Sequence, residues 1–178
     1  PFVFKKRISK ISRKNFIDIW ENTYKKIHFD TNSFVHRDYF CNNLIYLSKQ
    51  KKHLKCGIID YQDAFWGDQV LDIVSLFEDS RRLIKTNIKN KLIKEYLIKT
   101  KSRKNYEQFL IKFNFIGASR QTRILGKWLK FYSFYNKPEY LKYVNHTWYW
   151  LEKNLEDPFL KNLKKLYLEI VPNNKRNT

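Results

Sequence analysis

The sequence predicts an α+β fold that is mostly α-helical. From Asn87 onward, apolar residues recur at helical spacing with polar residues between them. Before this region, two short apolar segments at residues 44–47 and 55–59 flank a polar turn at residues 48–52, which predicts a β-hairpin. With 178 residues and 43% hydrophobic content, the chain is long enough for one substantial core. We therefore expect one globular unit.

The first expected element is a helix over residues 8–28. Its apolar side chains recur close to every 3.6 residues, and they are Ile11, Phe16, Ile19, Trp20, Tyr24 and Ile27. The polar segment at residues 30–33 is rich in turn-forming residues and is expected to end this element. The helix should pack on the core through its apolar face.

The predicted hairpin places two polar side chains near each other. Asn43 precedes the first strand, and Asp60 directly follows the second. Because the outer ends of a two-stranded hairpin lie side by side, both side chains can face one site.

The next expected element is a buried helix over residues 70–77, with Asp68 as its cap. Asp72 lies inside this apolar stretch. A carboxylate in such a place is costly unless it accepts hydrogen bonds. Its side chain therefore either accepts backbone N–H groups of a nearby loop or is displaced to solvent.

The remainder of the chain is expected to be helical. The expected helices cover residues 92–98, 106–135, 138–155 and 159–170. Gly117 and Gly126 interrupt the longest of them and indicate a bend or a close helix crossing. Pro138 and Pro158 each suit the first turn of a helix.

The aromatic residues of this helical region allow two interpretations. They are either core residues or, for one or two of them, the lining of a cleft, since sugar rings also stack on aromatic faces. The set comprises Trp128, Phe131, Tyr132, Phe134, Tyr135, Trp148, Tyr149 and Trp150. Arg120 and Arg123 lie one turn apart and either meet an acidic acceptor or face water, and we favour water.

One loop carries the residue types that phosphoryl transfer requires. His36, Arg37 and Asp38 are followed by Asn43, five residues after the Asp, which is the spacing of a kinase catalytic loop. A carboxylate such as Asp38 can orient an acceptor hydroxyl and take its proton, while Asn43 and Asp60 offer hard oxygen ligands for Mg²⁺. The alternative is that these residues only form turns and cap a strand end.

These residues resemble the aminoglycoside phosphotransferase and choline kinase-like family in order and spacing. The likeness rests on residues 36–43 and 59–64, with Gly67, Asp68, Asp72 and Ile73. Within that family, residues 60–64, residues 72–76 with Asp79, and residues 113–143 are most similar to bacterial kinases that phosphorylate N-acetylmuramate and N-acetylglucosamine at the anomeric hydroxyl.

The resemblance implies a role for each matched position. Asp38 is expected to be the catalytic base, Asn43 and Asp60 the ligands of Mg²⁺, and His36 and Asp72 the residues that brace the catalytic loop, with ATP as the donor. Candidate contacts to the acceptor or phosphate are Arg37, Asp63 and Arg120. Phe40, Cys41 and Asn42 depart from the residues usual in the family.

The resemblance also implies a place in a larger enzyme. Residues 1–172 are expected to form the C-terminal catalytic lobe of a protein-kinase-like fold, and residues 173–178 a polar tail. The N-terminal lobe that covers the nucleotide is expected to be a missing partner region of the same protein. This chain alone should therefore show little kinase turnover.

Composition narrows the other possibilities. The formal net charge is +19 and the sequence pI is about 9.9, but the basic residues are spread along the chain. We therefore favour a solvated basic surface over a nucleic-acid-binding face. Two cysteines form no metal or disulfide pattern, and no apolar run is long enough to span a membrane, so we expect a cytoplasmic protein. With the family resemblance, the expected function is that of a small-molecule kinase. A non-catalytic kinase-like module and a nucleic-acid-binding domain are the alternatives.

Overall fold

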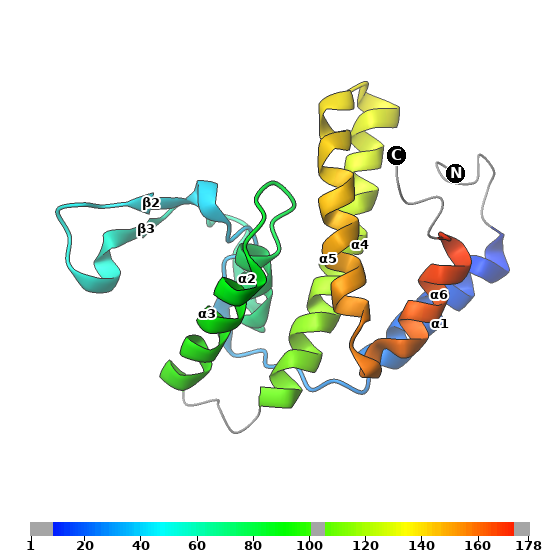
Figure 1. Ribbon diagram of the computed structural model, residues 1–178, viewed down its shortest axis with the longest axis horizontal. Helices are drawn as coiled ribbons and strands as arrows, with labels where there is room; N and C mark the ends of the chain where they lie inside the picture. Colours follow the sequence, from blue (N-terminus) through cyan, green and yellow to red (C-terminus); the bar gives the residue numbers. More distant parts are fainter. Residues whose placement is uncertain (1–8, 101–105, 173–178) are drawn as a thin grey trace. The chain divides into compact units, whose positions relative to one another are not determined.

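The computed structural model describes residues 9–100 and 106–172 (Figure 1). The chain divides into two compact units. The hairpin unit is Phe29–Lys104, and the helical unit combines Pro1–His28 with Asn105–Thr178. The expected mostly helical α+β composition is confirmed, whereas the assignment of residues 1–172 to one catalytic lobe stays a prediction. The expected tail at residues 173–178 lies outside the described residues.

The hairpin unit contains two antiparallel pairs of short strands. Strands β2 (Leu44–Tyr46) and β3 (Cys56–Ile58) form the predicted hairpin, in which Leu44 lies opposite Ile58. A 3₁₀ helix at Lys52–Lys55 forms the end of the connection, directly before β3. The second pair, β1 (Ser33–Val35) with β4 (Phe65–Gly67), was not predicted. It brings the segments before and after the hairpin together.

Two helices complete the hairpin unit. Helix α2 (Val70–Phe77) has the predicted bounds, and it buries Val70, Val74 and Phe77. The carboxylate of Asp68 accepts the backbone N–H of Val70 at 3.0 Å, which is the capping role expected of it. Helix α3 (Thr86–Lys99) is longer than the predicted 92–98 segment, because polar residues extend it by a turn and a half at its start.

The helical unit begins with α1 (Lys10–Tyr24), which is shorter than the predicted 8–28 helix. The Ser9 side chain accepts the backbone N–H of Ser12 at 3.0 Å and so caps its start. The chain leaves the helix after Tyr24, where Ile27 donates its N–H to the Tyr24 carbonyl in a turn. Ile11 is 83% exposed, so it is not a core residue as its spacing suggested.

Helix α4 (Tyr106–Tyr135) has the predicted bounds and runs unbroken through both glycines. Gly117 is buried, but Gly126 is exposed and has no atom within 4 Å of the position that a Cβ would take. The prediction of a close crossing at Gly126 is therefore wrong.

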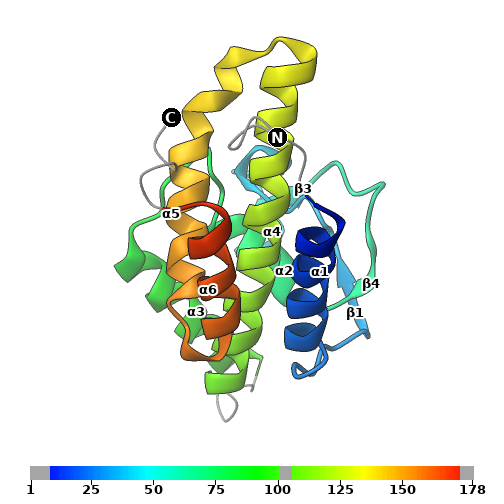
Figure 2. The ribbon, with the colours of Figure 1, turned by 90° about the vertical axis from the view of Figure 1, so that its right-hand side faces the viewer.

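Helices α5 (Val144–Leu155) and α6 (Lys161–Ile170) complete the helical unit. Helix α5 packs along α4, and α6 packs against α1 and α5 (Figures 1 and 2). Pro138 and Pro158 do begin helices as predicted, but these are the 3₁₀ helices Pro138–Tyr143 and Pro158–Leu160, which precede α5 and α6. The Asp157 carboxylate accepts hydrogen bonds from the Phe159 N–H and from the side-chain amide of Asn114 on α4. It therefore links the start of the Pro158–Leu160 helix to α4.

The aromatic residues of the helical unit divide between core and surface. Trp150 is 1% exposed, and Trp128 is buried and donates its indole N–H to Thr147 at 3.1 Å. The Trp128 ring stacks on Tyr140 at a centroid distance of 5.2 Å. In contrast, Phe134 is 80% exposed. The core interpretation is therefore right for the two buried tryptophans and wrong for Phe134.

The apolar content and length of the helices bear on membrane crossing. Over residues 9–100 and 106–172, none of them combines the length and the apolar composition that a bilayer-spanning segment requires.

Tyr167 offers a test of the packing in the helical unit. Burial raises the pKa of its phenol to about 12, although hydrogen bonds with Thr122 and Trp20 oppose this rise. In the unfolded chain the phenol has a pKa near 10. The difference between the two pKa values therefore adds to the free energy of unfolding below pH 10, and this addition is lost as pH rises through 12. The loss amounts to about 3 kcal/mol.

We expect Tyr167→Phe to remove this part of the alkaline loss. The measurement is urea unfolding of both proteins at about pH 9 and about pH 12, comparing the change in unfolding free energy between the two pH values. Because the comparison is made within each protein, the lost hydrogen bond to Thr122 cancels. An equal loss in both proteins would show that the phenol is not buried as described.

Candidate functional site

The candidate site is built on the loop that links β1 to β2. The Asp72 carboxylate on α2 accepts the backbone N–H of His36 at 2.7 Å and that of Arg37 at 2.9 Å. Arg37 has a φ of 75°, a left-handed conformation that costs energy in a residue other than glycine. The two bonds from Asp72 hold the backbone at this point, so α2 sets the direction in which the loop leaves β1.

The environment of Asp72 also affects its ionisation. Burial raises the pKa of the Asp72 carboxyl and outweighs the hydrogen bonds from His36 and Arg37 that lower it. The nearby charge of Asp38 adds to the rise. Of the two alternatives for this residue, the structure has the one in which its oxygens accept backbone N–H groups.

His36 joins the loop to the strand before Asp60. Its side chain is 2% exposed, and its Nε2 lies 2.9 Å from the Ile59 carbonyl oxygen. A carbonyl only accepts hydrogen bonds, so Nε2 carries the proton of this bond. Among the residues that the structure describes, none pairs with the buried Nδ1. The imidazole therefore fixes the spacing between the loop and the end of β3.

Asn43 and Asp60 are brought together at the open end of the hairpin. The side-chain amide of Asn43 donates to the Asp38 carbonyl at 2.9 Å and to Asp60 Oδ2 at 3.2 Å. The other oxygen of Asp60 accepts from Gln62 at 2.9 Å. Asp60 has a φ of 68°, and the Ile59 N–H donates to the Asn43 carbonyl. The two predicted metal-binding positions are thus adjacent in space.

The oxygen atoms of this pair suit a hard divalent cation. Asp60 supplies a carboxylate, and the Asn43 amide is 7% exposed and held by two hydrogen bonds from its nitrogen. Mg²⁺ commonly takes one or two protein oxygen ligands and fills its other positions with water and substrate phosphates. Over the described ranges, no three His, Cys, Asp or Glu side chains gather into a metal site. The donor set therefore fits a cation shared with a phosphate ligand.

Asp38 is exposed and lies in the same loop, before the 3₁₀ helix Cys41–Asn43. Its backbone carbonyl is the one bound by Asn43, so the position of Asp38 is coupled to that of the metal-binding pair. The ring of Tyr39 packs edge-on against the imidazole of His36, with 5.9 Å between the ring centroids. Burial, with the nearby Cys56 and Asp72, raises the pKa of the Tyr39 phenol.

The other candidate contacts are less closely tied to this site. Arg37 and Asp63 are exposed side chains of the hairpin unit. Arg120 belongs to α4 in the helical unit and is 8% exposed, so the interpretation that it faces water is wrong. Arg123, one turn later, is exposed as expected.

A contact between Arg81 and Phe40 was not predicted. The guanidinium carbon of Arg81 lies 3.9 Å from the centroid of the Phe40 ring, two residues beyond Asp38. The same guanidinium is paired with Asp79. An acidic residue two positions before an arginine was the available sequence signal, but it says nothing about Phe40, which is 41 residues before Arg81.

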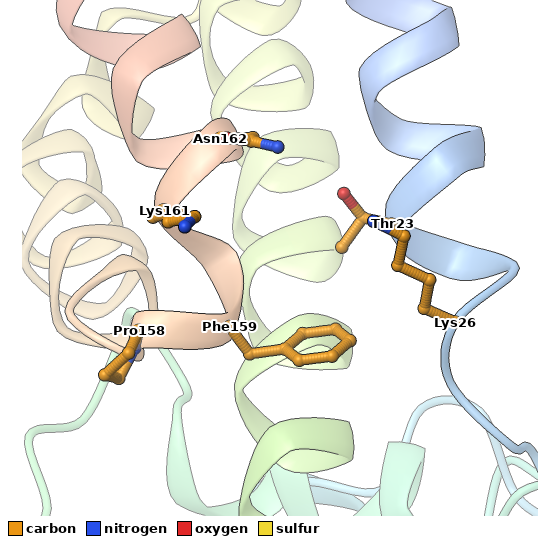
Figure 3. Close-up of a pocket in the computed structure, with 6 residues that line it drawn as sticks. All are labelled: Thr23, Lys26, Pro158, Phe159, Lys161 and Asn162. Carbon is orange, nitrogen blue, oxygen red and sulfur yellow. The ribbon is translucent and has the colours of Figure 1, made fainter.

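The helical unit contains a separate hollow, shown in Figure 3. It has a volume of about 290 Å³ and lies between the end of α1 and the start of α6. Its lining residues are Thr23, Lys26, Pro158, Phe159, Lys161 and Asn162. None of the predicted site residues is among them, so this hollow is distinct from the candidate site.

Two comparisons relate the chain to known proteins. Residues 14–107 match the sequence profile described as the phosphotransferase enzyme family. The chain is also 29% identical, over 154 residues, to an N-acetylmuramate/N-acetylglucosamine kinase from Caulobacter vibrioides. This match covers 86% of the chain but 42% of the relative, so the chain spans less than half of that kinase's length.

Proposed function

The chain belongs to the phosphotransferase enzyme family, and from this premise we propose that the protein containing it transfers a phosphoryl group from ATP to a hydroxyl of a small molecule. The observation that carries the proposal is the pairing of Asn43 with Asp60 at 3.2 Å, with the same amide bound to the Asp38 backbone. One amide thus connects the proposed base to the proposed metal ligands.

In this proposal Asp38 acts on the acceptor. Its carboxylate accepts a hydrogen bond from the acceptor hydroxyl, orients it for attack on the γ-phosphorus, and takes its proton as the new P–O bond forms. The exposure of Asp38 leaves its side chain accessible to a substrate. Asp72 contributes indirectly, because it holds the backbone just before Asp38.

Asn43 and Asp60 act on the donor. We propose that the side-chain oxygens of Asn43 and Asp60 would hold Mg²⁺, and that the ion would supply positive charge against the phosphates of the donor. Gln62 and Asn43 each donate a hydrogen bond to Asp60, and so hold its carboxylate at the end of β3.

We also propose that this chain is the C-terminal lobe of a kinase-like enzyme and that a nucleotide-binding lobe is supplied by the same protein. Support comes from the match to part of a longer kinase. The two free cysteines, Cys41 and Cys56, suit the cytoplasmic location that we propose for this enzyme.

The proposed acceptor is an N-acetylated amino sugar, phosphorylated at the anomeric hydroxyl. Support comes from the relative named as an N-acetylmuramate/N-acetylglucosamine kinase. The net charge of +19 also disfavours a polycationic aminoglycoside, because like charges raise the cost of binding. Other small-molecule kinases and a non-catalytic module are the competing functions, and a binding module would have no use for Asp38, Asn43 and Asp60 together.

An acceptor panel tests this proposal. The protein that contains this chain is incubated with MgATP and, separately, N-acetylglucosamine, N-acetylmuramate, choline, homoserine and kanamycin. We expect phosphorylation of one or both amino sugars, measured as the new phosphate ester by ³¹P NMR. Phosphorylation of kanamycin alone would contradict the amino-sugar acceptor, and nucleotide binding without any transfer would favour the non-catalytic module.

A further inference from the structure

The Arg81 side chain packs against Phe40 of the candidate catalytic loop, and its orientation is fixed by Asp79 and by Phe40. Its Nε donates to Asp79 Oδ1 at 2.8 Å, and its Nη2 donates to Oδ2 at 3.1 Å, which is the two-pronged geometry of a strong arginine–carboxylate pair. The Asp79 side chain is 8% exposed and also accepts the Arg81 backbone N–H at 3.1 Å. Asp79 therefore holds both the backbone and the side chain of Arg81.

The Phe40 ring also restrains the orientation of the Arg81 guanidinium. The guanidinium stacks at 3.9 Å from the ring centroid, so its plane cannot rotate freely while the carboxylate holds one edge. A guanidinium has five N–H groups, and the pair with Asp79 uses one on Nε and one on Nη2. The Arg81 side chain remains 34% exposed. Three N–H groups are thus left for another anion.

The position of this guanidinium suggests what that anion is. Phe40 follows the proposed base Asp38 by two residues in one short loop, and the reaction develops negative charge on the oxygens of the transferred phosphoryl group. An ion pair with only a structural role would need neither the stacking on this loop nor the accessible edge. Arg81 only donates hydrogen bonds to oxygen atoms and forms no covalent bond.

We propose that Arg81 binds an anionic oxygen group of a reactant at the transfer site. This inference rests on the proposed function. The group is either the phosphoryl group that is being transferred or a carboxylate of the acceptor, and the same N–H donors suit both. Asp79 and Phe40 are the positioning residues that hold the guanidinium.

Two acceptors distinguish the sources, because N-acetylmuramate carries a carboxylate and N-acetylglucosamine does not. Arg81→Gln and Arg81→Lys are compared with Arg82→Gln, which removes the same charge from the exposed neighbour. If the phosphoryl group is bound, Arg81→Gln lowers kcat by about 10- to 100-fold with both sugars. If the carboxylate is bound, KM rises for N-acetylmuramate alone. Wild-type kcat and KM with both sugars would overturn the proposal.

A binding measurement on the wild-type protein tests the inference even if the Arg81 variants fail to fold or the wild type shows no kinase activity. Inorganic phosphate is titrated into the ¹⁵N-labelled wild-type protein while the guanidinium N–H signals of its arginines are followed by NMR. We expect a saturable shift of the Arg81 signal and no comparable shift for Arg82. Absence of a shift at Arg81 overturns this inference, whereas an inactive wild type with a clear shift overturns the proposed function alone.

Discussion

Replacing Asp38 with Asn is expected to lower kcat by about 10²- to 10⁴-fold, the usual contribution of a positioned general base. Asn has nearly the same size and can still accept a hydrogen bond, but it cannot take the proton of the acceptor hydroxyl. Because Asn43 binds the backbone carbonyl of Asp38 and not its side chain, the loop should keep its shape in the variant. Nucleotide affinity should therefore change little, since the loss arises in the transition state.

The experiment needs kinetics and binding on the same protein preparations. The values of kcat and KM are measured with the best acceptor of the panel, and the affinity for MgATP is measured by calorimetry. Asp18→Asn in α1 is a matched control, because it makes the same chemical change at an exposed carboxylate outside the site. A kcat for Asp38→Asn within a few-fold of wild type would rule out Asp38 as the base.

The local elements were largely predictable from sequence periodicity. The bounds of α2 and α4 agree with those predicted, because each has apolar residues at helical spacing over its whole length. The hairpin was also predictable from two short apolar segments around a polar turn. Helix α1 is shorter than the predicted 8–28 segment. Within it, Ile11 and Tyr24 fit the apolar spacing but are exposed, so spacing did not report burial there.

Pairings between distant segments were harder to predict. Strands β1 and β4 are three residues each and about thirty residues apart, so neither is long enough to show an alternating pattern. The contact of Arg81 with Phe40 depends on the same long-range geometry. Asp72 differs in this respect, because the cost of burying an unpaired carboxylate left only two alternatives, and the structure has the one with backbone N–H donors nearby.

The second large effect is expected at Asp60. Asp60→Ala should weaken magnesium-dependent nucleotide binding by about 100-fold or more. Mutating a residue that only hydrogen-bonds to a metal ligand already costs about 10- to 100-fold in metal affinity or activity. Asp60 is the only carboxylate of the proposed pair, because Asn43 contributes a neutral amide. Its removal takes away the charge that attracts the cation, and it also leaves the Asn43 amide with one acceptor in place of two.

Backbone strain is a competing explanation for such a loss, and a second variant separates the two. Asp60 has a φ of 68°, a conformation that Asn tolerates better than Ala. If the charge is what matters, Asp60→Asn and Asp60→Ala both lose MgATP affinity, and both bind ATP in excess EDTA as the wild type does. If Asp60→Asn keeps wild-type MgATP affinity, the negative charge of Asp60 does not hold the cation, and the loss in Asp60→Ala comes from the backbone or from the missing side-chain oxygen. If Asp38→Asn lowers MgATP affinity to the same extent as the Asp60 variants, the division between base and metal ligand is wrong.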